Sequence, residues 1–243
     1  MRAALAFLTC LGGPVPPTPR ALPWFPVVGA GLGLVLGATW WVAEALWPPL
    51  LAATLVVAAD LAVTGMLHLD GLADSADGLL AHGLEPSRRL EVMAEPSVGA
   101  FALGTVVLVL GMRIATLSAL RPSPGMLAAL WATSRAAMAL AVHTQPYARD
   151  RGLATSFRGG TPAAARTVIG LVAVLAVIAS VTVVTSGAAD LGPVILAVAV
   201  AVLAAAGVVG LARRRVGGYT GDVLGAAGMV AETAGLVVAA TRW

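Results

Sequence analysis

Residues Gly65 to Asp77 read G-M-L-H-L-D-G-L-A-D-S-A-D and end a long apolar run that begins at Pro49. Asp70, Asp74 and Asp77 stand at positions i, i+4 and i+7, so a helix places their carboxylates on one face. Three neighbouring like charges repel one another unless a cation lies among them. Oxygen ligands suit a hard cation, so the stretch predicts a site for Mg²⁺, with Mn²⁺ as the alternative, completed by substrate phosphate.

The alternative for this stretch is a purely structural role, as a helix end that carries solvated acids, because Asp is common at helix starts. Three acids at helical spacing exceed what capping requires. Gly71 and Gly78 would let another backbone or a ligand approach the helix closely. His68 lies about half a helical turn from Asp70, so it is expected to hydrogen-bond a neighbour or contact substrate rather than bind the metal.

The composition predicts an integral membrane protein. Of the 243 residues, 59% are hydrophobic and 11% charged, whereas about a quarter of a soluble domain is charged. The lone Cys10 excludes an intramolecular disulfide and a thiolate zinc cluster. All basic residues are Arg, without the aromatic-interleaved basic stripe of a nucleic-acid-binding protein, so no nucleic acid partner is expected. No cleavable signal peptide is expected either, because residues 1–11 are short and prolines follow them.

Seven apolar segments approach the ~20 residues that cross a bilayer. They predict an all-α, polytopic membrane bundle formed by a single domain, 1–243. The segments are Trp24–Leu46, Pro49–Leu69, Val98–Leu120, Pro124–His143, Ala164–Ser186, Leu191–Leu211 and Tyr219–Ala240.

The arginines predict the orientation, because cytoplasmic loops carry an excess of basic residues. With seven spans, Arg121 and Arg242 fall on one side, and eleven arginines fall on the other, which is then cytoplasmic. The N-terminus would be cytoplasmic too, as would the polar segments 70–97, 144–163 and 212–222. The eleven are Arg2, Arg20, Arg88, Arg89, Arg149, Arg151, Arg158, Arg166, Arg213, Arg214 and Arg215.

A short helix is predicted at Ser87–Glu95, with Ser87 as its N-cap and Pro96 ending it. It is either a surface amphipathic helix held by pairs such as Arg88–Glu91, or part of the site. In the second interpretation Glu95 adds a fourth acid near the metal, and Arg88 or Arg89 holds a phosphate.

The stretch Arg213–Asp222, R-R-R-V-G-G-Y-T-G-D, combines cations with a glycine turn, and such turns can cradle phosphate at a helix N-terminus. Its arginines also serve as a topology anchor. The glycines at positions 217, 221 and 225 could equally form a packing face. The loop Arg149–Arg158 could clamp an anionic substrate, with topology anchoring as its alternative.

Four ionisable residues fall at hydrocarbon depth within the predicted spans, where exposure to lipid costs several kcal/mol each. They are Asp60, Arg113, Arg135 and Glu232. The acids could neutralise the arginines. Alternatively, Arg135 could reach a substrate phosphate.

The stretch Val63–Gly78, V-T-G-M-L-H-L-D-G-L-A-D-S-A-D-G, resembles the signature of the cobalamin synthase family. Three other stretches resemble that family in order and spacing: F-L-T at Phe7–Thr9, R-L-E-V-M at Arg89–Met93, and G-G-Y-T-G-D-V-L-G-A at Gly217–Ala226, followed by Glu232. The chain departs from the family pattern at Cys10, where Arg is usual, and at residues 94–97, where a basic residue and D-S are usual.

The resemblance implies a Mg²⁺-dependent phosphotransferase of the bacterial cytoplasmic membrane, an adenosylcobinamide-GDP ribazoletransferase. It would join α-ribazole or its 5′-phosphate to adenosylcobinamide-GDP and release GMP. On this basis Asp70, Asp74 and Asp77 would hold Mg²⁺ with Glu95 nearby, and Asp77 or Asp74 would act as the base. The expected substrate contacts are His68, Arg88, Arg89, Arg135, Arg149, Arg158, Thr220 and Asp222.

Two other functions are consistent with parts of the pattern. A CDP-alcohol phosphotransferase of phospholipid synthesis also uses an aspartate array, but its D-G-x-x-A-R order fails here at Asp74 and Ser75. A small transporter could use the ionisable residues within the spans as a relay. A homo-oligomer is left open.

Overall fold

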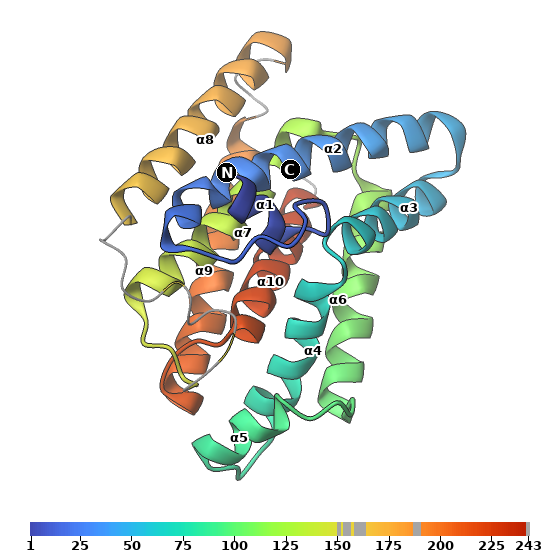
Figure 1. The fold of residues 1–243 in the computed structure, drawn as a ribbon. Helices are drawn as coiled ribbons and strands as arrows, with labels where there is room; N and C mark the ends of the chain where they lie inside the picture. The colour runs from blue at the N-terminus through green and yellow to red at the C-terminus, as the bar shows by residue number, and fades with distance from the viewer. Residues whose placement is uncertain (150–151, 153–156, 158–163, 187–190, 242–243) are drawn as a thin grey trace.

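The computed structural model describes residues 1–149, 152, 157, 164–186 and 191–241, and the described part is helical (Figure 1). The elements, in order, are α1 (Arg2–Leu8), η1 (Pro19–Trp24), α2 (Phe25–Leu46), α3 (Pro49–Val63), α4 (Leu67–Leu80), α5 (Pro86–Val92), α6 (Ala100–Ala119), α7 (Pro124–Thr144), α8 (Ala164–Ser186), α9 (Leu191–Val216) and α10 (Gly221–Ala239). The all-α prediction is confirmed.

Five of the described helices are long and apolar enough to cross a membrane: η1 with α2, α6, α7, α9 and α10. The bent pair α3 and α4 would raise the number to six. The described part of the chain therefore accounts for five or six spans, and the number seven and the side of the N-terminus stay predictions. Local sequence sets the helix starts: Pro occupies the first turn of α3 and α7, and the Ser123 hydroxyl caps α7.

The structure interrupts the predicted span Pro49–Leu69 with a sharp bend. The chain ends α3 at Val63 and starts α4 at Leu67, with a bend of 90° between the two helices. Gly65 and Met66 adopt left-handed backbone conformations, both with φ of 59°, which a right-handed helix cannot contain. Apolarity continues across the break, so hydropathy alone could not reveal it.

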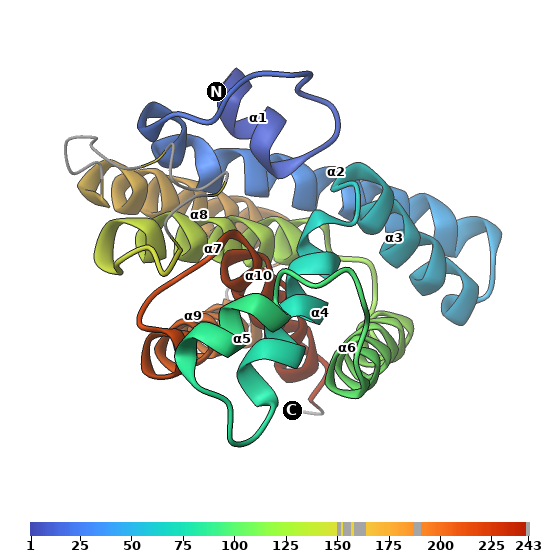
Figure 2. The same cartoon turned by 60° about the horizontal axis from the view of Figure 1, so that its bottom comes forward.

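The helices form two layers that cross. Figure 2 shows α2, α7 and α8 side by side, with α4, α6, α9 and α10 packed beneath them. Gly33 of α2 sits directly against the Leu127 carbonyl of α7, so no side chain fits between these helices. Helices α7 and α10 are mostly buried, whereas α6 and α9 expose most of their apolar surface. This distribution suits a bundle with lipid around α6 and α9.

Candidate active site

The acidic helix α4 crosses the start of α10 at two glycines. A Cβ added at Gly71 would lie 2.7 Å from the Asp222 carbonyl oxygen, and one added at Gly225 would lie 3.1 Å from the His68 Cα. The two backbones therefore touch, as the sequence predicted for Gly71. The crossing brings Asp70 and Asp74 of α4 close enough to Asp222 for their negative charges to repel one another. Two segments about 150 residues apart thus form one acidic cluster.

The loop before α10 holds Asp222 in place. Tyr219 pairs with the segment after α7, donating its N–H to the Pro146 carbonyl at 2.9 Å and accepting the N–H of Ala148 at 2.9 Å. The buried Thr220 hydroxyl accepts the Val223 N–H at 3.2 Å and donates to Asp222 Oδ2 at 3.2 Å. Thr220 is therefore the N-cap of α10. This cap orients a substrate-binding candidate, Asp222, at a helix N-terminus.

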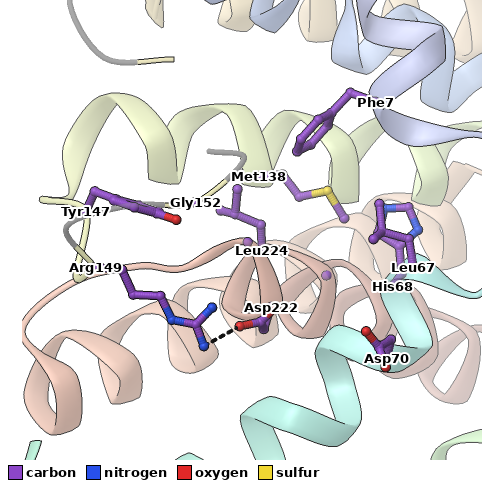
Figure 3. A pocket seen from close by; sticks show the side chains of 12 residues that line it. Phe7, Leu67, His68, Asp70, Met138, Tyr147, Arg149, Gly152, Asp222 and Leu224 are labelled. Carbon is purple, nitrogen blue, oxygen red and sulfur yellow. Dashed lines mark ion pairs between the residues drawn. The ribbon is translucent and has the colours of Figure 1, made fainter. Parts of the chain in front are cut away.

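A cavity of about 270 Å³ opens at this crossing (Figure 3). Four residues predicted for the site contribute polar side chains to its lining: His68, Asp70, Arg149 and Asp222. Tyr147 adds a hydroxyl. Arg149 Nη2 lies 3.0 Å from Asp222 Oδ2, and this ion pair is about three-quarters buried. The other lining residues are Phe7, Leu67, Met138, Tyr147, Gly152, Gly221, Leu224 and Gly225. The predicted anion holder Arg149 thus lines the same cavity as Asp70 of α4.

Asp77 points away from this cluster toward α6. Its Oδ2 accepts the Gly99 N–H at 2.6 Å, and its Oδ1 accepts the Ala102 N–H at 2.9 Å. Both oxygens thus satisfy backbone donors at the start of α6, which leave no partner within a helix. The structure gives Asp77 a capping contact, and it places Asp74 rather than Asp77 beside Asp70 and Asp222.

The segment after α4 uses its charged residues for structure. A helix was predicted at Ser87–Glu95, and the observed helix, α5 (Pro86–Val92), is shorter and begins one residue earlier. Glu85 is its N-cap, and Pro86 stands in its first turn, where the fixed φ of proline is already helical. Arg88 pairs on the surface with Glu91 at 3.0 Å and with Glu95 at 2.9 Å. This is the surface-pair arrangement that the sequence left open.

Arg89 is buried and caps the end of α4. Its guanidinium donates to the carbonyls of Gly78 at 2.8 Å, Ala81 at 2.9 Å and Leu84 at 2.9 Å. These contacts satisfy carbonyls at a helix C-terminus. A Cβ added at Gly78 would lie against the Met93 side chain and 3.0 Å from the Arg89 carbonyl oxygen, so the close backbone approach predicted there is confirmed.

The four ionisable residues within the bundle form a separate buried ion-pair cluster: Asp60, Arg113, Arg135 and Glu232. Arg113 pairs with Asp60 at 2.8 Å and with Glu232, which also pairs with Arg135. Trp131 Nε1 donates to Asp60 at 3.1 Å, and the Ser134 hydroxyl donates to Glu232 at 2.6 Å. Mutual neutralisation is therefore the arrangement seen, and Arg135 is not among the described residues that line the cavity.

The acids at the crossing suit a hard cation in their chemistry, although they form no closed cage. Within the described ranges, no three His, Cys, Asp or Glu side chains are arranged to hold a metal ion. Asp70, Asp74 and Asp222 supply only oxygen donors, and in the part of the chain that the structure describes Arg149 is the cation that pairs with one of them, Asp222. Mg²⁺ usually takes one or two carboxylates and completes its shell with water and phosphate, so these residues fit it.

Sequence reasoning missed the apolar side of the cavity. Phe7, Met138 and Tyr147 come from α1, the end of α7 and the loop that follows it. The F-L-T stretch drew attention to Phe7, but nothing in the pattern placed it opposite Asp222. The predicted contact Arg158 lies outside the described residues, and Glu95 lies with Arg88 on the surface.

The fold and the cavity together define a multi-pass helical membrane protein with a carboxylate-lined site between two crossed helices. The family model described as cobalamin-5-phosphate synthase matches residues 1–240. The chain belongs to this family.

Curated relatives agree with this assignment. The adenosylcobinamide-GDP ribazoletransferase of Brucella anthropi is 37% identical over 234 residues, covering 91% of this chain and 86% of the relative. The proteins of the same name from Brucella canis and Brucella melitensis are each 37% identical over 229 residues, covering 90% of this chain and 85% of their own. No solved structure matches the chain.

Proposed function

We propose that this chain is an adenosylcobinamide-GDP ribazoletransferase. A ribose hydroxyl of α-ribazole or its 5′-phosphate attacks the phosphorus attached to the cobinamide, and GMP leaves. The observation that carries the proposal is the convergence of Asp70 of α4, the start of α10 and Arg149 on one cavity. The family match over almost the whole chain favours this reaction over phospholipid synthesis or transport.

Different residues at the cavity have different roles in binding the diphosphate and the attacking hydroxyl. Arg149 holds a phosphate oxygen, because its guanidinium lies at the cavity beside the N-terminus of α10. Asp70 and Asp222 line the same cavity, so either carboxylate can accept the proton of a hydroxyl bound there. Thr220 keeps Asp222 in position through its hydroxyl.

We propose Mg²⁺ as the metal, held by one or two of the carboxylates Asp70, Asp74 and Asp222, because these three acids outnumber the described arginine that pairs with them. When bound, the ion neutralises the charge that develops on the diphosphate. Asp77 is left out of this set, since both of its oxygens already accept backbone N–H groups.

We place the site at the cytoplasmic face of a bacterial membrane. The support is the predicted topology, in which eleven arginines share the side that also carries residues 70–97 and 212–222. Nucleotide substrates are available on that side.

The test is to incubate membranes that contain the protein with adenosylcobinamide-GDP, α-ribazole and Mg²⁺, and to follow GMP and cobalamin by mass spectrometry. GMP should appear only when both organic substrates are present. Chelation with EDTA should stop the reaction, and added Mg²⁺ should restore it. GMP release in the absence of α-ribazole would contradict the proposed transfer reaction. Full activity in EDTA would contradict the proposed dependence on Mg²⁺.

A further inference from the structure

We infer that the cavity between α4, α7 and α10 is the subsite for the acceptor nucleoside, with its aromatic base on the apolar wall and its ribose toward His68 and Asp70. The inference rests on the proposed function and assigns one of its two substrates to a place in the fold.

The size of the cavity selects a small ligand. Its volume of about 270 Å³ lies just below the ~300–1,000 Å³ that is usual for small-molecule pockets. A nucleoside is of this scale. A corrin macrocycle that carries a nucleotide arm is several times larger, so only the diphosphate of that substrate could reach the mouth of the cavity.

The apolar wall selects an aromatic base with few polar atoms. Figure 3 shows Phe7 and Met138 on the side of the cavity opposite Asp222 and Asp70, with Tyr147 at one end. Phe7 also packs against Phe25 and Phe157, which do not line the cavity, with ring-centroid distances of 5.7 and 5.0 Å. An aromatic and thioether wall favours a flat apolar ring. Guanine would need polar partners along its edge, and the Phe7 and Met138 side chains offer none, which leaves the Tyr147 hydroxyl at one end.

His68 supplies the second, independent indication of a ligand. Its side chain is 6% exposed and lines the cavity, yet its Nδ1 has no hydrogen-bond partner in the described part of the chain. A buried polar atom without a partner is costly, and a bound hydroxyl would satisfy it. Asp70 lines the same end of the cavity (Figure 3), so two polar groups are available to a ribose.

Leu67 offers a way to fill the cavity without disturbing the core, because it lines the cavity and is 45% exposed. Leu80 is a matched control at the other end of the same helix, with 40% exposure and no place in the cavity lining. Full-length protein in lipid nanodiscs is tested for α-ribazole binding by equilibrium dialysis, and for GMP release with each substrate varied in turn.

Leu67→Trp should weaken α-ribazole binding and raise its KM by about tenfold or more, while the KM for adenosylcobinamide-GDP stays within twofold. Leu80→Trp should leave both constants unchanged. His68→Phe, which keeps the size but removes the polar atoms, should weaken α-ribazole binding about tenfold, the scale of one hydrogen bond.

Unchanged α-ribazole binding in Leu67→Trp would overturn the inference. A raised KM for adenosylcobinamide-GDP in place of α-ribazole would also overturn it, because guanosine or the corrinoid would then occupy the cavity. Its failure differs from failure of the proposed function. Saturable, Leu67-dependent α-ribazole binding without GMP release would refute the transferase and keep the subsite. Normal turnover in Leu67→Trp would keep the transferase and refute the subsite.

Discussion

Helix α10 carries two acids, Asp222 and Glu232, that belong to very different surroundings. Glu232 lies in the buried ion-pair cluster, where two acids face two arginines and the side chains are almost completely enclosed. Asp222 lines the cavity with Asp70, and Asp74 lies close enough for the charges of the three acids to repel one another. Among the described residues, Arg149 forms an ion pair with Asp222. Charges that the protein balances internally hold helices together, whereas an unbalanced set is available to a ligand.

The largest expected effect comes from breaking the balanced cluster. Glu232→Gln leaves Arg113 and Arg135 short of one buried negative charge, which typically costs about 3–5 kcal/mol of stability. The melting temperature in detergent should fall sharply, and little folded protein should accumulate. The exposed Glu91→Gln is the matched control and should melt like the original chain. Equal melting of the two variants would show that Glu232 does not hold the helices together.

Removing one negative charge from the acids near the cavity should reduce turnover without reducing stability. Asp74→Asn should lower kcat by about 10²–10³-fold, the scale of removing one charge-stabilising group from an active site. Its melting temperature should stay close to the original, because Asp74 has like-charged neighbours and removing one charge relieves repulsion. GMP release is the measurement. Near-normal turnover would remove Asp74 from the metal site.

Asp77→Asn tests whether two acids one helical turn apart on α4 have different tasks. An asparagine keeps one acceptor oxygen for the start of α6 and loses the other, so stability should fall by about 1 kcal/mol, as for other helix caps. Turnover should fall much less than in Asp74→Asn. If turnover instead fell as much as in Asp74→Asn while the melting temperature stayed the same, the result would show that Asp77 takes part in the metal site.

The smallest effect is expected at the surface. Arg88→Ala removes exposed pairs with Glu91 and Glu95, and such pairs contribute little because water screens them. Melting temperature and the KM of both substrates should be unchanged. A raised KM for adenosylcobinamide-GDP would show instead that Arg88 leaves its surface partners to hold a phosphate.

Much of the fold could be predicted because it depends on local patterns. Most of the apolar segments correspond to helices within a few residues, since burial in lipid requires long apolar stretches. The α3–α4 break could not be predicted, because Met66 adopts a left-handed conformation that no residue preference signals. Arg89 looked like a phosphate ligand, and only its distance to three carbonyls shows that it caps α4.

Periodicity and hydropathy are properties of the chain, so they were enough to predict a helical membrane protein with acids at helical spacing on one segment. Which acids face one another depends on how the helices cross. The glycine contacts between α4 and α10 bring Asp222 to Asp70 and Asp74, while α6 takes up Asp77. Spacing along one helix fixes only the direction of a side chain, and its partner depends on which helix crosses there.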